Sequence, residues 1–133
     1  MTERWKWIKK TDLVFSDFIR IRDKLICQKC WKSYDRLSTS IQCSHFFPRD
    51  NQSVRFDEVN CETLCGGCHI YLGNNPVAHR EHKLERIGRK AFDLLQYRAR
   101  KTTHFRVADY KVLYRHYYDL TKDTRAWIQA GAA

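Results

Sequence analysis

Two C-x-x-C pairs restrict the folds open to this chain more than any other feature of its 133 residues. Cys27 and Cys30 form the first pair, and Cys65 and Cys68 form the second. Four thiolates at these spacings suit tetrahedral Zn²⁺. Disulfides would need an oxidising compartment, but the start MTERWKWIKK lacks the apolar segment of a signal peptide, and no apolar run is long enough for a membrane span. We therefore expect a cytoplasmic protein with a structural zinc site and no membrane association.

Two more cysteines and two glycines accompany these pairs. Cys43 and Cys61 lie outside the C-x-x-C pattern, so we expect small buried residues, with replacement of a zinc ligand as the alternative. Gly66 and Gly67 are expected to let the second pair turn tightly, so that backbone N–H groups approach the sulfur atoms.

The charge of the chain favours a polyanionic partner. Lys and Arg number 25 against 15 Asp and Glu, a net charge of +10, and the surplus is concentrated in residues 76–133. Nucleic acid is the leading candidate, because basic side chains that contact phosphates release bound counterions. The residues expected to contact phosphate are Arg49, Arg55, Arg80, Lys83, Arg86, Arg89 and Lys90.

The hydrophobic patterns predict an α+β fold. Residues 12–26 read as a helix or a turn-rich lead-in, with Ser16 as a possible cap. Alternation in STSIQCSHFF, residues 38–47, predicts a strand, and residues 54–60 predict a second one. A helix is expected from about Glu62 until Gly73.

Two further helices are expected in the second half of the chain, over residues 78–100 and 106–128. Their apolar stripes are formed by Leu84, Ile87, Ala91, Leu94 and Leu95, and by Val107, Tyr110, Leu113, Tyr114, Tyr117 and Leu120. We divide the chain into a helical lead-in at 1–26, a zinc-knuckle core at 27–75 and basic helices at 76–133, all within one compact domain.

Three polar residues acquire a joint meaning inside this zinc-stapled strand–strand–helix frame. His45 closes the first strand, Asn60 follows in the second, and His69 comes directly after the second cysteine pair. This order resembles the HNH, or ββα-metal, nuclease motif, and in particular its zinc-stapled branch that includes the phage recombination endonuclease VII.

A more specific resemblance covers about residues 15–88. The segments FSDFIRIRDKLICQKC and SHFFPRDNQSVRFDEVNCETLCGGCHIYLGNNPVAHREHKLERIG are similar to the phage NinG family, also called Rap. The resemblance implies a structure-selective endonuclease of phage recombination, working in the cytoplasm of a bacterial host. Its expected substrates are Holliday junctions and displacement loops, cut to leave a 5′-phosphate and a 3′-hydroxyl.

The resemblance also implies roles for the three polar residues. His45 is the expected general base, since a neutral imidazole can take a proton from water. His69 is the expected ligand of a catalytic Mg²⁺ or Mn²⁺ ion, and Asn60 the residue that orients the base and its loop.

Two departures from the family patterns leave the ligand set of the catalytic metal open. Ser44 stands where many HNH enzymes carry Asp or His, and His69 stands where NinG relatives usually carry Asn. Further ligands are sought among Ser44, Asp57, Glu58, Asn74, Asn75, His79 and His82.

Other functions remain open at this point. One is a zinc-stabilised DNA-binding module without catalysis, and another is an HNH nicking or homing nuclease that reads duplex sequence, or a nuclease of structured RNA. The basic helix over 78–100 suits phosphate better than base edges, which favours recognition of shape. A homodimer would match the two-fold symmetry of branched DNA, with the helix over 106–128 either forming the interface or covering the core.

Overall fold

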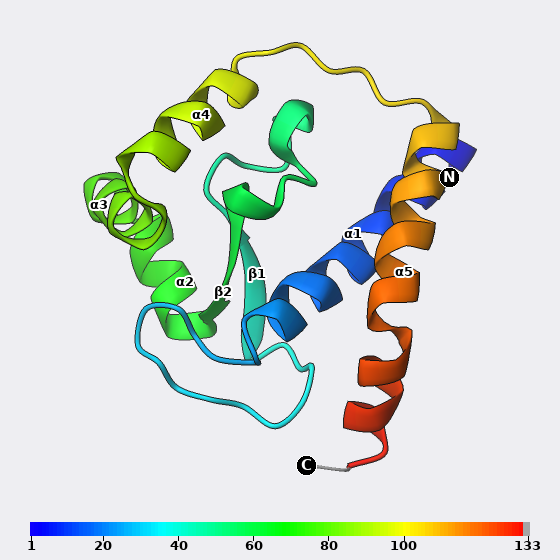
Figure 1. Ribbon diagram of the computed structural model, residues 1–133, viewed down its shortest axis with the longest axis horizontal. Coiled ribbons are helices and arrows are strands. Elements are labelled where there is room, and N and C mark those ends of the chain that lie inside the picture. Colours follow the sequence, from blue (N-terminus) through cyan, green and yellow to red (C-terminus); the bar gives the residue numbers. More distant parts are fainter. Residues whose placement is uncertain (132–133) are drawn as a thin grey trace.

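The computed structural model describes residues 1–131 as five helices around one small antiparallel sheet (Figure 1). This arrangement confirms the expected α+β class. In chain order the elements are α1 (Glu3–Arg22), β1 (Ile41–His45), β2 (Cys61–Cys65), α2 (Gly66–Gly73), α3 (Pro76–Ile87), α4 (Arg89–Ala99) and α5 (Val107–Gln129). None of the helices within residues 1–131 has the length and apolar character needed to cross a membrane.

The second strand lies later in the chain than the sequence predicts. Residues 54–60 are not a strand, because this segment forms two 3₁₀ turns, Gln52–Val54 and Glu58–Asn60. The Asp57 side chain accepts a hydrogen bond from the Val59 N–H at 3.0 Å, and such side-chain bonds to the backbone compete with strand pairing. Consequently β2 starts at Cys61 and α2 at Gly66 instead of Glu62.

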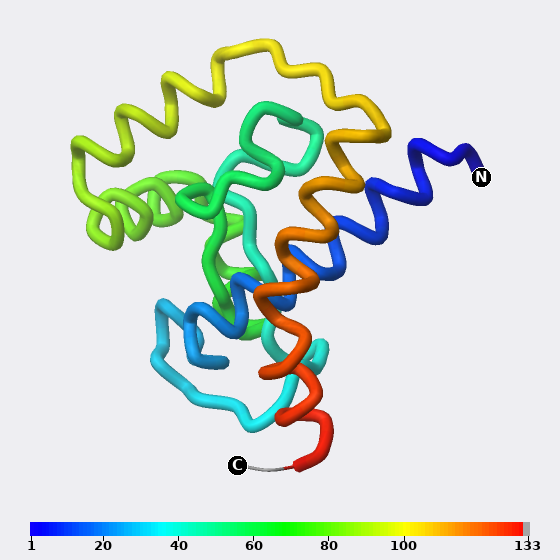
Figure 2. The backbone as a smooth tube through the Cα atoms, turned by 45° about the vertical axis from the view of Figure 1, so that its right-hand side comes forward, coloured from blue at the N-terminus to red at the C-terminus, as the bar shows by residue number. Residues whose placement is uncertain are grey.

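Helix α1 is longer than expected and runs in the same direction as α5 (Figure 2). It begins at Glu3, where the Thr2 hydroxyl caps it by accepting from the Trp5 N–H at 3.1 Å, so Ser16 lies inside the helix and is not a cap. The two helices are joined by aromatic pairs such as Trp7–Tyr114, by a hydrogen bond from Thr11 Oγ1 to the Tyr110 carbonyl, and by an Arg125–Asp17 ion pair.

The basic segment after α2 forms two helices instead of one. Gly88 separates α3 from α4 with φ +84°, a left-handed conformation that glycine adopts without a steric penalty. Two members of the expected apolar stripes, Leu94 and Leu120, are exposed, whereas Phe92 and Thr121 are buried near them in sequence. Thr121 is buried without an unpaired hydroxyl, since it donates to the Tyr117 carbonyl at 2.8 Å.

The sheet has a packed face on each side. Cys43 and Cys61 join the cluster formed with α1 and α5, which also contains Val14, Phe15, Ile19 and Tyr117. Leu64 points to the other side and packs with Cys27 and Leu72. Within residues 1–131, β1 pairs with β2 alone, so the second edge of β1 carries no strand partner there.

The four cysteines of the two C-x-x-C pairs converge. Their sulfur atoms all lie within 4.8 Å of one another, so they can hold one structural zinc ion. The Cys30 N–H approaches Cys27 Sγ at 3.5 Å, and the Cys68 N–H approaches Cys65 Sγ at 3.4 Å, as expected for two knuckles. This site ties the turn after α1 to the junction of β2 and α2.

Gly66 and Gly67 contribute less to the turn of the second C-x-x-C pair than predicted. Gly66 and Gly67 are the first residues of α2, neither has a positive φ, and a Cβ added at either position would meet open space. The left-handed residue of the zinc knuckles is instead Trp31, with φ +66°.

Loss of zinc should unfold the turn after α1. Cys30 is exposed, so Cys30→Ser removes a ligand without leaving a cavity in the core. We expect the variant to lose the zinc ion of the four-cysteine site and its melting temperature to fall by roughly 10 °C or more, because zinc binding contributes directly to folding. Mass spectrometry and thermal unfolding with and without a chelator test this. A chelator that leaves the melting temperature of the unmodified protein unchanged would contradict it.

Candidate functional site

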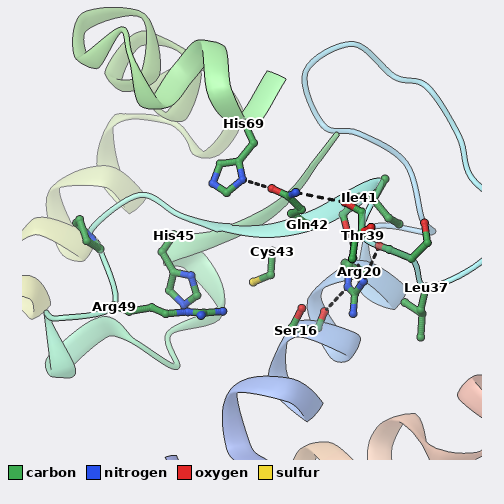
Figure 3. A pocket seen from close by; sticks show the side chains of 12 residues that line it. Ser16, Arg20, Leu37, Thr39, Ile41, Gln42, Cys43, His45, Arg49 and His69 are labelled. Atoms are coloured by element: carbon green, nitrogen blue, oxygen red, sulfur yellow. Dashed lines mark hydrogen bonds between the residues drawn. The ribbon is translucent and has the colours of Figure 1, made fainter. Parts of the chain in front are cut away.

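His45 and His69 line the same pocket, which has a volume of about 780 Å³. The pocket follows the unpaired edge of β1, with His69 of α2 on one side of the strand and His45 on the other (Figure 3). Arg20 and Arg49 complete its charged lining. The strand–strand–helix arrangement therefore brings two of the predicted site residues together.

His45 is held by the backbone of the loop between the strands. Its Nε2 lies 2.9 Å from the Arg55 carbonyl oxygen, which can only accept, so Nε2 carries the proton and Nδ1 keeps a free lone pair. Burial, together with the positive charge of Arg49, lowers the pKa of His45 to about 4. The imidazole is therefore neutral at physiological pH and can accept a proton.

Arg55 explains how this carbonyl is positioned. Its guanidinium is buried, forms an ion pair of 2.6 Å with Asp12 of α1, and donates to the Arg49 carbonyl at 2.9 Å. Arg55 was expected to contact DNA, but a buried side chain paired with Asp12 is not available to phosphate. The Arg55 side chain instead anchors the backbone whose carbonyl contacts His45.

Asn60 fixes the other end of the same loop. It is fully buried and its amide is saturated: Oδ1 accepts from the Phe47 N–H at 2.8 Å, while Nδ2 donates to the Phe47 and Val54 carbonyls at 3.0 and 3.1 Å. Asn60 lies just before β2 and not inside the second strand. These bonds suit the expected role of orienting the loop that carries His45 and Arg55.

His69 is oriented in the opposite sense to His45. Its Nδ1 is hydrogen-bonded to Gln42 Oε1, and the Gln42 amide nitrogen donates to the Thr39 carbonyl at 3.2 Å, which assigns the amide oxygen to the histidine. His69 Nε2 is therefore the nitrogen with a free lone pair. Burial and the charge of Arg49 lower the pKa of His69, so the ring is neutral and suited to bind a cation.

Most of the other expected metal ligands have different partners. Asp57 forms an ion pair with Arg98 at 2.6 Å, and His82 Nε2 is hydrogen-bonded to Glu62 Oε1 at 2.7 Å. Ser44 is buried and Asn74 is exposed just beyond α2. The two remaining positions are also engaged: the Tyr117 hydroxyl donates to Glu58, and Asn75 donates to the Tyr71 carbonyl.

His79 is the exception in this set. It packs edge-on against Phe46 at 4.9 Å, and its pKa is lowered mainly by burial, with a smaller contribution from His69. Among residues 1–131, no group of three His, Cys, Asp or Glu ligand atoms in mutual reach includes His69. The chain thus offers an imidazole nitrogen to a divalent ion, and water and phosphate oxygens would complete the coordination.

The expected phosphate contacts divide by exposure. Lys83 is 1% exposed, so its assignment to DNA is wrong as well, and Arg86 is engaged by Glu62 at 2.8 Å and Gln28 at 2.6 Å. The exposed members are Arg49, Arg80, Arg89 and Lys90, of which Arg89 pairs with Asp93. Arg49 is the one that also lines the pocket.

Two functional features were missed from the sequence. Gln42 orients His69, and strand alternation could have suggested it, because Gln42 and Ser44 face away from Cys43 and His45. The Arg55 carbonyl had no such signal, since a backbone acceptor leaves no mark on residue type.

Comparisons with known proteins identify the family of the chain. The family described as Bacteriophage Lambda NinG protein matches residues 1–126. A similar protein is "Protein ninG" of Enterobacteria phage H19B, 30% identical over 91 residues, which are 68% of this chain and 44% of that relative. The chain therefore spans less than half of the relative's length. No solved structure matches it. Since the family match extends over nearly all of its residues, the chain belongs to the NinG family.

Proposed function

We propose that the chain is a metal-dependent DNA endonuclease that acts on branched recombination intermediates such as Holliday junctions and displacement loops. One observation carries the proposal: two neutral imidazoles with free lone pairs line one pocket, each held by an acceptor on its other nitrogen. This is the pairing of a proton acceptor and a cation ligand that phosphodiester hydrolysis requires.

The residues divide the reaction between them. His45 Nδ1 takes the proton from the attacking water, and the Arg55 carbonyl stabilises the ring as it becomes charged. Arg49, which is exposed and lines the pocket, attracts the phosphate into it. His69 Nε2 would hold Mg²⁺ or Mn²⁺, and that ion, when bound, supplies Lewis acidity to the phosphate and the departing oxygen. By family resemblance, the products are a 5′-phosphate and a 3′-hydroxyl.

The charge of the chain favours DNA as the substrate, and the family resemblance favours branched DNA. The net charge of +10 suits a phosphate backbone, and α3 and α4 present exposed Arg80, Arg89 and Lys90. These side chains are better suited to phosphate than to base readout.

Removing the base should abolish cutting without abolishing binding. We expect His45→Ala to reduce cleavage of a four-way junction by about 10²–10⁴-fold with Mg²⁺ or Mn²⁺ present, because that is the usual contribution of a general base. His104→Ala is the matched control, since His104 is exposed outside the pocket, and it should cut normally.

The same assay separates the alternatives. The cleavage rate should depend on whether the DNA is a junction, a displacement loop or a linear duplex, and not on its sequence. Metal-dependent cutting retained by His45→Ala would exclude His45 as the base. Binding without cutting by the unmodified protein would favour a zinc-stabilised binding module, and strict dependence on one duplex sequence would favour a nicking or homing nuclease.

Gln42 should act only through His69. Gln42→Ala removes the acceptor that holds His69 Nδ1–H. We expect the affinity for the activating divalent ion to fall by about 10–100-fold, the usual effect of losing a partner of a metal ligand. Gln42→Glu keeps an acceptor and should largely restore the activation constant for Mn²⁺. If Gln42→Ala shows an unchanged Mn²⁺ activation curve, the positioning role is wrong.

The burial of His45 predicts a specific dependence of stability on pH. Its folded pKa of about 4 lies below the ordinary 6.5, so between these values the unfolded state binds more protons and the free energy of unfolding falls as pH falls. Above pH 6.5 this contribution is constant. Denaturant unfolding between pH 7 and 4 should show a smaller loss of stability for His45→Gln than for the unmodified protein. Identical slopes would contradict the lowered pKa.

A further inference from the structure

A second group of potential metal ligands includes the proposed general base, His45. The sulfur atoms of Cys43 and Cys61 and a ring nitrogen of His45 lie within 4.8 Å of one another. Neither Cys43 nor Cys61 belongs to the C-x-x-C pairs, and the proposed hydrolysis uses neither of them.

The antiparallel register brings the three side chains together. His45 is directly opposite Cys61, and Cys43 precedes His45 by two residues, so all three project from the same face of the sheet. In a tetrahedral site with bonds of about 2.0–2.3 Å, ligand atoms are roughly 3.3–3.8 Å apart. Small side-chain rotations are therefore sufficient to close the group around an ion.

The surroundings prepare the imidazole of His45 for a cation. The Arg55 carbonyl holds the proton on His45 Nε2, which leaves Nδ1 as the coordinating atom, the usual arrangement behind a metal-bound histidine. Burial and the neighbouring Cys43 raise the pKa of Cys61, so this thiol stays protonated until an incoming ion displaces its proton.

An ion can enter from the pocket. Cys43 and His45 both line it, and Cys61, 1% exposed, lies behind them (Figure 3 shows Cys43 and His45 on the same side of β1). Three protein ligands with one position facing a pocket form a coordinatively open site. Two thiolates and an imidazole select a thiophilic ion such as Zn²⁺ over Mg²⁺.

We infer that Cys43, His45 and Cys61 form a second, inhibitory site for Zn²⁺, in which the ion takes the lone pair that His45 needs as a base. Binding converts both thiols to thiolates and releases two protons to the solvent. The binding of the ion does not depend on the proposed function, but the inhibition rests on it.

The metal content of the reduced protein tests the binding. Native mass spectrometry with excess Zn²⁺ should show two ions per chain in the unmodified protein, one in Cys43→Ala and one in Cys30→Ser. With Co²⁺ in place of Zn²⁺, the thiolate-to-metal charge-transfer absorption of Cys43→Ala should be weaker than that of the unmodified protein. The bands of the four-cysteine site should remain. One ion per chain at saturating Zn²⁺ under reducing conditions overturns the inference.

Cleavage of a junction then tests the inhibition. At constant Mg²⁺ or Mn²⁺, Zn²⁺ should slow the unmodified protein by about 10²–10⁴-fold, the contribution of the base, and a chelator of moderate strength should restore it. Cys43→Ala should cut normally and resist Zn²⁺, because it retains His45. A protein that binds two ions but never cuts DNA would refute the nuclease proposal and leave the second site standing. Cutting with equal zinc sensitivity in Cys43→Ala would refute the inhibition alone.

Discussion

The convergence of four cysteines is the constraint on which the rest of the structure depends. A two-stranded sheet has little stability of its own, and here it is held on one side by α1 and α5 and on the other by α2. The cysteine cluster connects the turn after α1 to the point where β2 becomes α2. It therefore sets the direction in which α2 leaves the sheet, and with it the position of His69, one residue beyond Cys68.

A network of buried polar side chains fixes the position of His45 on the other side of β1. Asn60 ties the residues after β1 to the first 3₁₀ turn, and Arg55 is anchored to α1 through Asp12. Together they present one carbonyl to His45. Both histidines thus have their tautomers selected by fixed neighbouring acceptors, the Arg55 carbonyl and the Gln42 amide oxygen, so the pocket is lined by two lone pairs that need no rearrangement.

The sequence allowed the α+β class, the zinc cysteines, the first strand and the last helix to be predicted, because each has a local signature of spacing or periodicity. The second strand was misplaced, since residues 54–60 have β-prone side chains but Asp57 and Asn60 satisfy the backbone in turns. Arg55 and Lys83 were misread for a related reason. Charge alone suggests a phosphate contact, whereas burial and partners such as Asp12 are properties of the tertiary structure.

The proposed chemistry depends on His45 and His69 being neutral and holding their protons on opposite nitrogens. Long-range ¹H–¹⁵N correlation of the imidazole rings at pH 7 measures this directly. We expect the Nε2–H tautomer for His45 and the Nδ1–H tautomer for His69, with Mn²⁺ broadening the signals of His69 first. A charged His45 at pH 7, or the Nδ1–H tautomer at that residue, would contradict it.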